Sequence, residues 1–449
     1  MAVAGRHDDM WRYHPDLLAT PVPRYTSFPT AAEFGDDVGP HDMEAALATI
    51  GEDDPVSLYL HIPYCREICW YCGCNTGAAN RSGRVSAYLQ RLGEEVDLIA
   101  RNLAGRGQVR RIAWGGGSPN AIAPEAFDGL MLRISQAFRC NDPVVSIELD
   151  PRCFDSPWAD ALGRNNVSRA SLGVQTFAPH VQEAIGRVQP HSDIVRTVAQ
   201  LRGAGVDSIN FDLMYGLPGQ SMGDLTETLD AAVSMRPDRL AVFGYAHVPH
   251  LLPRQRRIDA TALPDGRMRF GQAALAHDRL CGAGYQPVGF DHFALPGDAI
   301  AVAARAGRLR RNFQGFTEDE SDVLIGLGAS AISAFPGWLL QNEKNAGRYH
   351  LQIGNGRLAT ARGLRRSPRD RLTGRLIERL LCDGRADVTG LPDLAGIRHR
   401  LAGFESEGLI AWSGNLLLLG DGGLPYARGI AAALDPYRKH SQIRFSSAV

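Results

Sequence analysis

Short apolar runs alternate with longer amphipathic stretches from about residue 56 to residue 295. The apolar runs are rich in valine, isoleucine and leucine, which is typical of buried strands. The longer stretches, such as Val85–Leu103, place apolar residues three or four positions apart, which predicts helices with one buried face. This alternation predicts a parallel sheet with helices outside it.

The predicted strands are Val56–Ile62, Val109–Trp114, Val144–Leu149, Arg169–Val174, Ser208–Met214, Leu240–Tyr245 and Tyr285–Phe290. The predicted helices are Val85–Leu103, Pro124–Phe138, Trp158–Arg164 and the stretches 179–203, 222–235 and 266–282. About six parallel strands are too few to close an eight-stranded barrel. We therefore expect an α/β fold with a partial (β/α)6 TIM-like barrel that is open along one side.

Polar and glycine-bearing segments follow the predicted strands. These segments are Cys65–Cys74, Gly115–Pro119, Asp150–Pro151, Gln175–Phe177, Gly216–Gly219 and His247–Pro249. The carboxyl ends of the strands are where α/β barrels carry their functional groups. We therefore expect these segments to form one shared site.

The pattern changes beyond about residue 300. Arginines recur between 362 and 379, which indicates a solvated helix face, and residues 408–419 (GLIAWSGNLLLL) predict a hairpin. We expect a small, mostly helical C-terminal domain with a winged hairpin.

Composition and charge narrow the class of protein. Hydrophobic residues make up 44% and charged residues 22% of the 449 residues, as is ordinary for a soluble globular protein. A net charge of −1 gives no general attraction to nucleic acid or anionic lipid. Residues 1–13 lack an apolar secretory core, and no run of about 18 apolar residues occurs, so we expect a cytoplasmic protein.

Four of the eight cysteines lie within ten positions, at Cys65, Cys69, Cys72 and Cys74. Such a cluster in a long chain indicates metal ligation rather than a disulfide framework. A structural zinc site requires four ligands, usually in two C-x2-C pairs, and the chain has no second pair. Cys74 follows Cys72 so closely that one loop has difficulty supplying a fourth ligand. If the first three cysteines hold a [4Fe–4S] cluster, its fourth iron is open to another ligand.

The spacing C-x3-C-x2-C after a strand resembles the signature of the radical S-adenosylmethionine (SAM) superfamily. The segment YLHIPYCREICWYCGCNT resembles the cluster loop of the oxygen-independent coproporphyrinogen III oxidases, with Cys74 included. Further blocks resemble that family in the same order: PRYTSFPTA (23–31), WGGGSPN (114–120), ELDPR (148–152), LGVQTF (172–177), AIGRVQ (184–189), INFDLMYGLPGQ (209–220), FGYAHVP (243–249), GFDHFALP (289–296), RNFQGFT (311–317) and LGASAIS (327–333). The chain matches the family less well after Cys382.

The resemblance implies an oxidoreductase that binds a [4Fe–4S] cluster and SAM, with the amino and carboxylate groups of SAM on the open iron. In that family, one-electron reduction cleaves SAM to methionine and a 5′-deoxyadenosyl radical. The substrate implied is coproporphyrinogen III, of which two propionates lose CO2 and become vinyl groups, giving protoporphyrinogen IX in haem biosynthesis. Because the cofactors carry the chemistry, no catalytic side chain is expected.

The resemblance also implies two SAM sites. The residues implied at the first site are Tyr59, Tyr71, Gly115, Glu148 and Ile332, with Glu148 accepting hydrogen bonds from the ribose hydroxyls. The residues implied at the second site are Gly116, Gly117, Gln175, Arg187, Asp212 and Ala246. There, Arg187 would pair with a SAM carboxylate and Asp212 would offset its positive charge.

The residues implied on the substrate side are Arg24, Tyr25, Cys74 and Gln314. A tetrapyrrole with four propionates needs cationic donors. The candidates in or near the matched blocks are Arg24, Arg254, Arg311 and His292, and the sequence does not choose among them.

The expected organisation has four parts: a lead segment over 1–50 on the substrate side, a radical SAM barrel over 51–300, its continuation with second-SAM and substrate contacts over 301–359, and the C-terminal domain over 360–449. We expect a monomer that acts on a small tetrapyrrole with an unidentified electron donor and acceptor, and without a nucleic-acid or membrane partner. Two alternatives share the scaffold: a haem-binding chaperone, and another radical SAM enzyme that modifies a tetrapyrrole. The presence of Cys74, PRYTSFPTA and RNFQGFT favours the oxidase.

Overall fold

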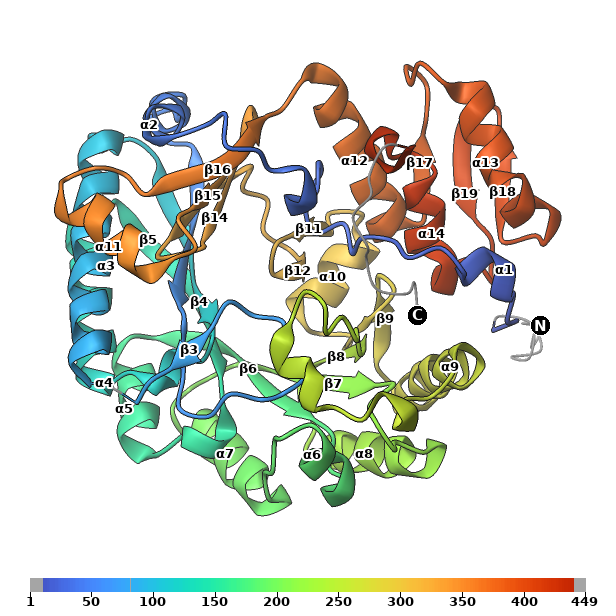
Figure 1. Ribbon diagram of the computed structural model, residues 1–449, viewed down its shortest axis with the longest axis horizontal. Helices are drawn as coiled ribbons and strands as arrows, with labels where there is room; N and C mark the ends of the chain where they lie inside the picture. Colours follow the sequence, from blue (N-terminus) through green and yellow to red (C-terminus); the bar gives the residue numbers. More distant parts are fainter. Residues whose placement is uncertain (1–10, 81, 440–449) are drawn as a thin grey trace.

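The computed structural model describes residues 11–80 and 82–439. Within these residues, twelve strands form one curved sheet in the order β16-β15-β14-β13-β1-β4-β5-β6-β7-β8-β10-β9 (Figure 1). Six parallel strands make its centre: β1 (Pro55–Ile62), β4 (Gln108–Gly116), β5 (Cys140–Leu149), β6 (Val167–Gln175), β7 (Ser208–Tyr215) and β8 (Arg239–Gly244). The predicted α/β partial barrel is confirmed.

Helices connect these strands and lie outside the curve of the sheet (Figure 1). They are α3 (Ser82–Leu103), α4 (Pro124–Ala137), α5 (Ser156–Arg164), α6 (Pro179–Ala184), α7 (His191–Gly203), α8 (Met222–Ser234) and α9 (Gly266–Gly282). In α3 the apolar stripe predicted from the sequence is buried, and Leu92 and Val96 have no exposed surface. Burial of this stripe holds α3 against the sheet in the connection between β1 and β4.

The sheet continues past β1 in a way that the apolar pattern did not predict. Strand β13 (Val323–Leu327) is buried at every position and pairs in parallel with β1, placing Val56 opposite Val323. Three antiparallel strands then follow: β14 (Ile332–Phe335), β15 (Trp338–Asn342) and β16 (Thr360–Arg365), with α11 (Ala346–Gly354) between the last two.

The strand predicted at Tyr285–Phe290 is shorter and keeps the direction of β8, but a strand that was not predicted lies between the two. The predicted strand is β9 (Gln286–Val288), which pairs antiparallel with β10 (His292–Ala294), and β10 pairs antiparallel with β8. A parallel strand would require a crossover of a dozen or more residues, but only residues 289–291 join β9 and β10. Gly289 adopts φ +61° in this turn, and a side chain there would collide with Phe316.

The C-terminal part lies beside α9 and β9 (Figure 1). It contains α12 (Pro368–Asp383), α13 (Leu394–Ser406) and α14 (Ala427–Ala432), with a three-stranded antiparallel sheet of β17 (Arg385–Asp387), β18 (Ile410–Ser413) and β19 (Leu416–Leu419). Strands β18 and β19 form the predicted hairpin. The arginine-rich run is divided between edge strand β16, which belongs to the large sheet, and helix α12.

The N-terminal segment connects the two ends of this arrangement. It runs from α1 (Pro15–Leu18), beside the C-terminal helices, to α2 (Pro40–Ala48), beside β16 (Figure 1). The buried Tyr25 hydroxyl donates a hydrogen bond to Asp435, at 3.0 Å. At the other end of the segment, Asp42 forms an ion pair with Arg365 of β16.

The short hairpin of β11 (Arg310–Asn312) and β12 (Gly315–Thr317) lies within the curve of the sheet (Figure 1). Glu318, directly after β12, contacts Arg111 of β4 at 2.8 Å, Arg169 of β6, and Arg239 of β8 at 3.9 Å. These arginines lie near the first residues of their strands. The glutamate therefore closes the amino-terminal end of the barrel.

In the described part of the chain, no helix is long and apolar enough to cross a membrane.

Candidate active site

A cavity of about 460 Å³ lies at the carboxyl ends of the parallel strands. Its walls come from the cysteine loop after β1, the glycine turn after β4, the ends of β5 and β6, strand β7 and the loop after β8. The prediction that these loops form one site is confirmed, except that Gly216–Gly219 does not line this cavity.

Cys65, Cys69 and Cys72 all line this cavity, as does Cys74. Burial and the neighbouring thiols Cys72 and Cys69 raise the pKa of Cys65 to about 12. The thiol of Cys72 is different, because hydrogen bonds from Cys74 lower its pKa to about 6, and the Cys74 backbone N–H donates to its sulfur at 3.4 Å. Crowded thiols that raise one another's pKa are stabilised as thiolates by a bound cation.

These sulfur atoms fit a cluster better than a single ion. Among residues 11–80 and 82–439, no three His, Cys, Asp or Glu side chains gather closely enough to hold one metal ion. An iron–sulfur cluster takes each thiolate at a separate iron, so its ligands need not converge on one point. Three cavity-lining thiols on one loop therefore fit a [4Fe–4S] cluster with one iron left open.

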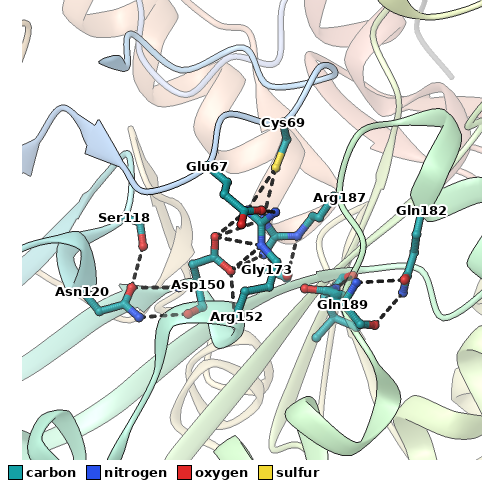
Figure 2. Close-up of polar contacts among 11 residues, drawn as sticks. Glu67, Cys69, Ser118, Asn120, Asp150, Arg152, Gly173, Gln182, Arg187 and Gln189 are labelled. Atoms are coloured by element: carbon teal, nitrogen blue, oxygen red, sulfur yellow. Dashed lines mark hydrogen bonds and ion pairs between the residues drawn. The ribbon is translucent and has the colours of Figure 1, made fainter. Parts of the chain in front are cut away.

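Two guanidinium groups contact the sulfur of Cys69 (Figure 2). Arg187 Nη1 lies 3.3 Å from this sulfur and Arg152 Nη2 lies 3.5 Å from it. Both arginines also pair with Asp150, whose pKa they hold below its usual range although burial opposes this. The network places positive charge beside the Cys69 sulfur and holds the end of β5 against the cysteine loop.

The N–H groups of Arg187 are all directed at protein atoms. Its five contacts are two with the Gly173 carbonyl, two with the Asp150 carboxylate and one with Cys69. A guanidinium has five N–H donors in total. In this arrangement Arg187 therefore positions Cys69 and Asp150, and pairing with a SAM carboxylate would require it to exchange one of these contacts.

The glycine turn passes so close to its neighbours that side chains are excluded. A Cβ at Gly115 would lie 2.7 Å from the Glu148 carboxylate, and one at Gly117 would lie 2.5 Å from the Tyr64 carbonyl oxygen. Gly116 adopts φ +111°, and its N–H donates to Glu148 at 3.1 Å. The turn thus brings bare backbone to the cavity and holds the carboxylate in place.

Glu148 and Asp212 are two further carboxylates that line the cavity. Burial and the charge of Asp212 raise the pKa of Glu148 to about 7, although the Gly116 N–H opposes this. Burial also raises the pKa of Asp212, which accepts hydrogen bonds from Ser171 and Asn210. Both carboxylates would be stabilised in their charged form by a cationic ligand such as a sulfonium or ammonium group.

A second buried network connects the cysteine loop to the turn after β13. The His61 ring lies between Tyr59, whose hydroxyl is 3.2 Å from Nδ1, and Ser330, whose hydroxyl is 3.3 Å from Nε2. Burial lowers the pKa of His61 to about 4, so the ring is neutral. Tyr88 donates to the His61 carbonyl, and fully buried Glu95 accepts from the Gly328 N–H.

The structure brings together most of the residues that the resemblance implied. Those that line the 460 Å³ cavity are Arg24, Cys65, Cys69, Tyr71, Cys72, Cys74, Gly116, Gly117, Glu148, Gln175, Arg187, Asp212 and Ala246. Tyr59 lines an adjoining cavity together with Cys74 and Glu148. Gly115 lies against Glu148 without lining either cavity.

Three implied residues lie elsewhere. Gln314 is exposed and lines a separate cavity inside the barrel, which shares Glu148 and Asp212 with the main one. Tyr25 points its hydroxyl at Asp435, away from the cysteine loop. Ile332 begins β14 and lines neither the main cavity nor its neighbour beside Tyr59.

Four residues of the site were not singled out from the sequence. They are Arg152, Ser171, Phe243 and Gln255. Arg152 belongs to the quoted ELDPR block, so the signal was present, but its partner Cys69 is 83 positions distant along the chain.

Comparison with known proteins agrees with this geometry. Residues 59–232 match the radical SAM superfamily. The chain is 41% identical over 437 residues to an oxygen-independent coproporphyrinogen III oxidase of Bradyrhizobium diazoefficiens, covering 95% of this chain and 97% of the relative. It is 42% identical over 380 residues to an anaerobic coproporphyrinogen III oxidase of Cereibacter sphaeroides, covering 84% of this chain and 83% of the relative.

A solved structure shows the same fold. The coproporphyrinogen III oxidase of Escherichia coli, described as a radical SAM enzyme, superposes with a TM-score of 0.89 at 33% identity, over 95% of this chain and 100% of that one. Family membership follows from the identity and coverage of these relatives rather than from any single motif. The chain therefore belongs to the oxygen-independent coproporphyrinogen III oxidases of the radical SAM superfamily.

Proposed function

We propose that this protein converts two propionate side chains of coproporphyrinogen III to vinyl groups without oxygen, giving protoporphyrinogen IX. Each conversion transfers one hydrogen atom from the propionate to the SAM-derived radical, releases CO2 and passes one electron to a separate electron acceptor. The chemistry that a reduced cluster and SAM supply when bound is one-electron cleavage of a carbon–sulfur bond, which yields an alkyl radical able to take that hydrogen atom.

The protein's own residues hold and isolate the reacting groups. Cys65, Cys69 and Cys72 would hold the cluster, and the bare glycine turn gives SAM access to its open iron. Glu148, fixed by the Gly116 N–H, is placed to accept hydrogen bonds from a ribose. No general acid or base is needed, because the substrate loses a hydrogen atom rather than a proton.

One observation supports the proposal above the others. The three cysteines line the same cavity as the glycine turn, Glu148 and Asp212, and Arg24 of the N-terminal segment lines it as well. A cluster ligand set, a nucleoside-binding carboxylate and a cation for an acidic substrate therefore share one enclosed space.

Anaerobic assay of the reconstituted protein tests the proposal. We expect incubation with dithionite, SAM and coproporphyrinogen III to yield two molecules of CO2 for each divinyl product, together with methionine and 5′-deoxyadenosine. Haem binding without cleavage of SAM would instead indicate the chaperone. Cleavage of SAM with a tetrapyrrole product that keeps all four carboxylates would indicate a different radical reaction.

We further propose that a second SAM molecule binds in the same cavity beside Gln175, Asp212 and Ala246. Gln175 ends β6 with φ +67°, a strained conformation of the kind that is often retained at ligand sites. Equilibrium dialysis of the cluster-loaded protein should then find two SAM molecules per chain. A stoichiometry of one at saturation would contradict this part of the proposal.

A further inference from the structure

Four arginines that are far apart in the sequence meet next to the main cavity. They are Arg24, Arg269, Arg311 and Arg428. Burial, together with the charges of Arg24 and Arg311, lowers the pKa of Arg428 to about 10. Burial together with the charge of Arg24 also lowers the pKa of Arg269 and of Arg311. The region is therefore positive enough for its own cations to repel one another.

Arg24 is the member of this group that faces the reaction site. It lines the 460 Å³ cavity of the cysteine loop and also a smaller cavity of about 60 Å³, which contains Arg428 and Asp291. Its guanidinium donates to the Gly244 carbonyl at 3.1 Å and lies over the Phe243 ring. Within the described chain, no carboxylate lies at ion-pair distance from Arg24.

Arg311 fixes the backbone that carries Arg24. Its Nη2 donates to the Arg24 carbonyl at 3.1 Å and its Nε donates to the Tyr25 carbonyl at 3.3 Å. Tyr25 adopts φ +49°, so the chain bends sharply at this point. The guanidinium of Arg311 also lies against the rings of Phe290 and Phe316, while its Nη1 is buried without a hydrogen-bond partner.

Two other candidate cations, His292 and Arg254, already have partners in the protein. His292 pairs with Asp291 at 2.6 Å, and although burial opposes ionisation, His292 and the nearby Arg311 and Arg24 lower the pKa of Asp291 to about 2. Arg254 donates to the hydroxyl and carbonyl of Thr76, on the far side of the cysteine loop. Asp291 is thus paired with His292, which leaves Arg24 without a carboxylate partner among the described residues.

We propose that Arg24 binds the carboxylate of a propionate side chain of the tetrapyrrole, and that Arg311 is the positioning residue that holds Arg24 at the cavity. This inference rests on the proposed function and names the part of the site that recognises its substrate. A guanidinium pairs with a carboxylate through two parallel hydrogen bonds, and among the described residues Arg24 contacts a carbonyl oxygen and an aromatic ring rather than a carboxylate.

The surroundings of Arg24 fit a propionate on a pyrrole ring. The walls shared by the two cavities are Arg24, Phe243 and Gly244, so an aromatic ring lies beside the guanidinium. A carboxylate bound by Arg24 also lies in the cavity that contains Asp212 and the cysteines, which places its side chain within reach of the radical chemistry. The same residue thus selects an acidic side chain and presents it for reaction.

The test measures binding of coproporphyrin III, the air-stable oxidised form with four propionates, to the cluster-loaded full-length protein by fluorescence quenching. Arg24→Met should raise its dissociation constant at least about 30-fold, the lower end of the cost of truncating one partner of a buried charge pair. Arg24→Lys should recover part of this loss. Mesoporphyrin IX, which has two propionates, should bind wild type more weakly than coproporphyrin III, and this preference should shrink in Arg24→Met.

Matched measurements separate the possible outcomes. Arg308→Met changes an exposed arginine that pairs with Glu320 and should leave porphyrin binding unchanged. SAM affinity and iron content should stay within about twofold of wild type in Arg24→Met. Unchanged porphyrin binding in that variant would overturn the assignment, as would an equal loss of SAM affinity, which would place Arg24 in the SAM site. If wild type binds coproporphyrin III but does not oxidise coproporphyrinogen III, the proposed reaction fails while the carboxylate site stands.

Discussion

The sulfur atoms of the cysteine loop differ in their surroundings. Cys69 receives two guanidinium contacts and Cys72 receives the Cys74 N–H. We expect that Cys74, only two positions after Cys72, is not a ligand of the same cluster. Cys74 lines the cavity and an adjoining one beside Tyr59, so it contributes to the wall of the site.

Replacing Cys65, Cys69 or Cys72 with alanine should therefore abolish the cluster, because three thiolates are the minimum set. Iron and sulfide analysis after anaerobic reconstitution measures this. Cys74→Ser should retain full iron and sulfide content but lower turnover. Loss of the cluster in Cys74→Ser would show that the fourth thiol is a ligand.

Arg187 should stabilise the folded protein through the positions of its N–H donors rather than through its charge alone. Arg187→Lys keeps the charge but cannot span Asp150, the Gly173 carbonyl and Cys69 at once. We expect the free energy of unfolding of this variant to be about 2 kcal/mol lower than that of wild type, which is the size of one lost buried hydrogen bond to a charged group. Denaturant titration measures this, and Arg196→Lys, at an exposed pair with Asp193, should change by less than about 0.5 kcal/mol.

A pattern within a few residues is sufficient to predict the cysteine ligands and the glycine turn, because both are local. The partners of Arg187 were not predictable in this way. Asp150 and Cys69 are 37 and 118 positions from it, and only the folded barrel brings the three together. The same holds for His61, whose partner Ser330 is 269 positions away.

Among the elements, the long helices with a regular apolar face were predicted well. Helix α9 begins and ends where the sequence indicated, and α4 differs by one residue at its end. Strands β13 to β16 were missed because they are short and because their order in the sheet depends on β13 pairing with β1, more than 250 residues earlier. Strand β10 was missed for a different reason, since it has only three residues and pairs with β9 across a turn of three residues.

The glycine turn after β4 provides a test at this scale. Gly117→Ala places a methyl group 2.5 Å from the Tyr64 carbonyl oxygen, which belongs to the backbone of the cysteine loop and cannot rotate away. We expect the turn and the loop to separate, lowering SAM affinity about tenfold. Isothermal titration of the cluster-loaded protein measures the affinity.

Gly129→Ala on α4 is the matched control, because nothing lies within 4 Å of its added methyl group. This variant should bind SAM as wild type does and should be slightly more stable, since alanine favours a helix by about 0.5–1 kcal/mol. Equal SAM affinity in the two variants would show that the turn tolerates displacement.

For the whole molecule, Glu318 holds three strands of the barrel at their amino ends. Burial opposes its ionisation, but Arg169, Arg111 and Arg239 lower its pKa to about 2. A glutamate in the unfolded chain has a pKa of about 4.3, so the charged form of Glu318 stabilises the folded state by about 3 kcal/mol. Because the folded pKa is the lower one, this contribution is complete above about pH 4.3 and is lost as the pH falls toward 2.

Glu318→Gln should lower the free energy of unfolding at pH 7 by about 3–5 kcal/mol, because it leaves the arginines without their shared partner. Its stability should also fall less steeply than that of wild type between about pH 5 and pH 3. Glu320→Gln, at an exposed pair with Arg308, should follow wild type at every pH. Denaturant titrations across this range measure both effects, and parallel pH curves for wild type and Glu318→Gln would contradict the assignment.

The hydrogen bond from Tyr25 to Asp435 joins positions 410 residues apart. At the usual rate of synthesis, of about 5–20 residues per second, the ribosome needs roughly 20 to 80 s to travel between them. The segment that carries Arg24 therefore emerges first and reaches its place among the last. During that interval the strands of the barrel are made, before Asp435 is available to Tyr25. The cavity wall that Arg24 contributes is therefore fixed by this contact only after the C-terminal residues have been made.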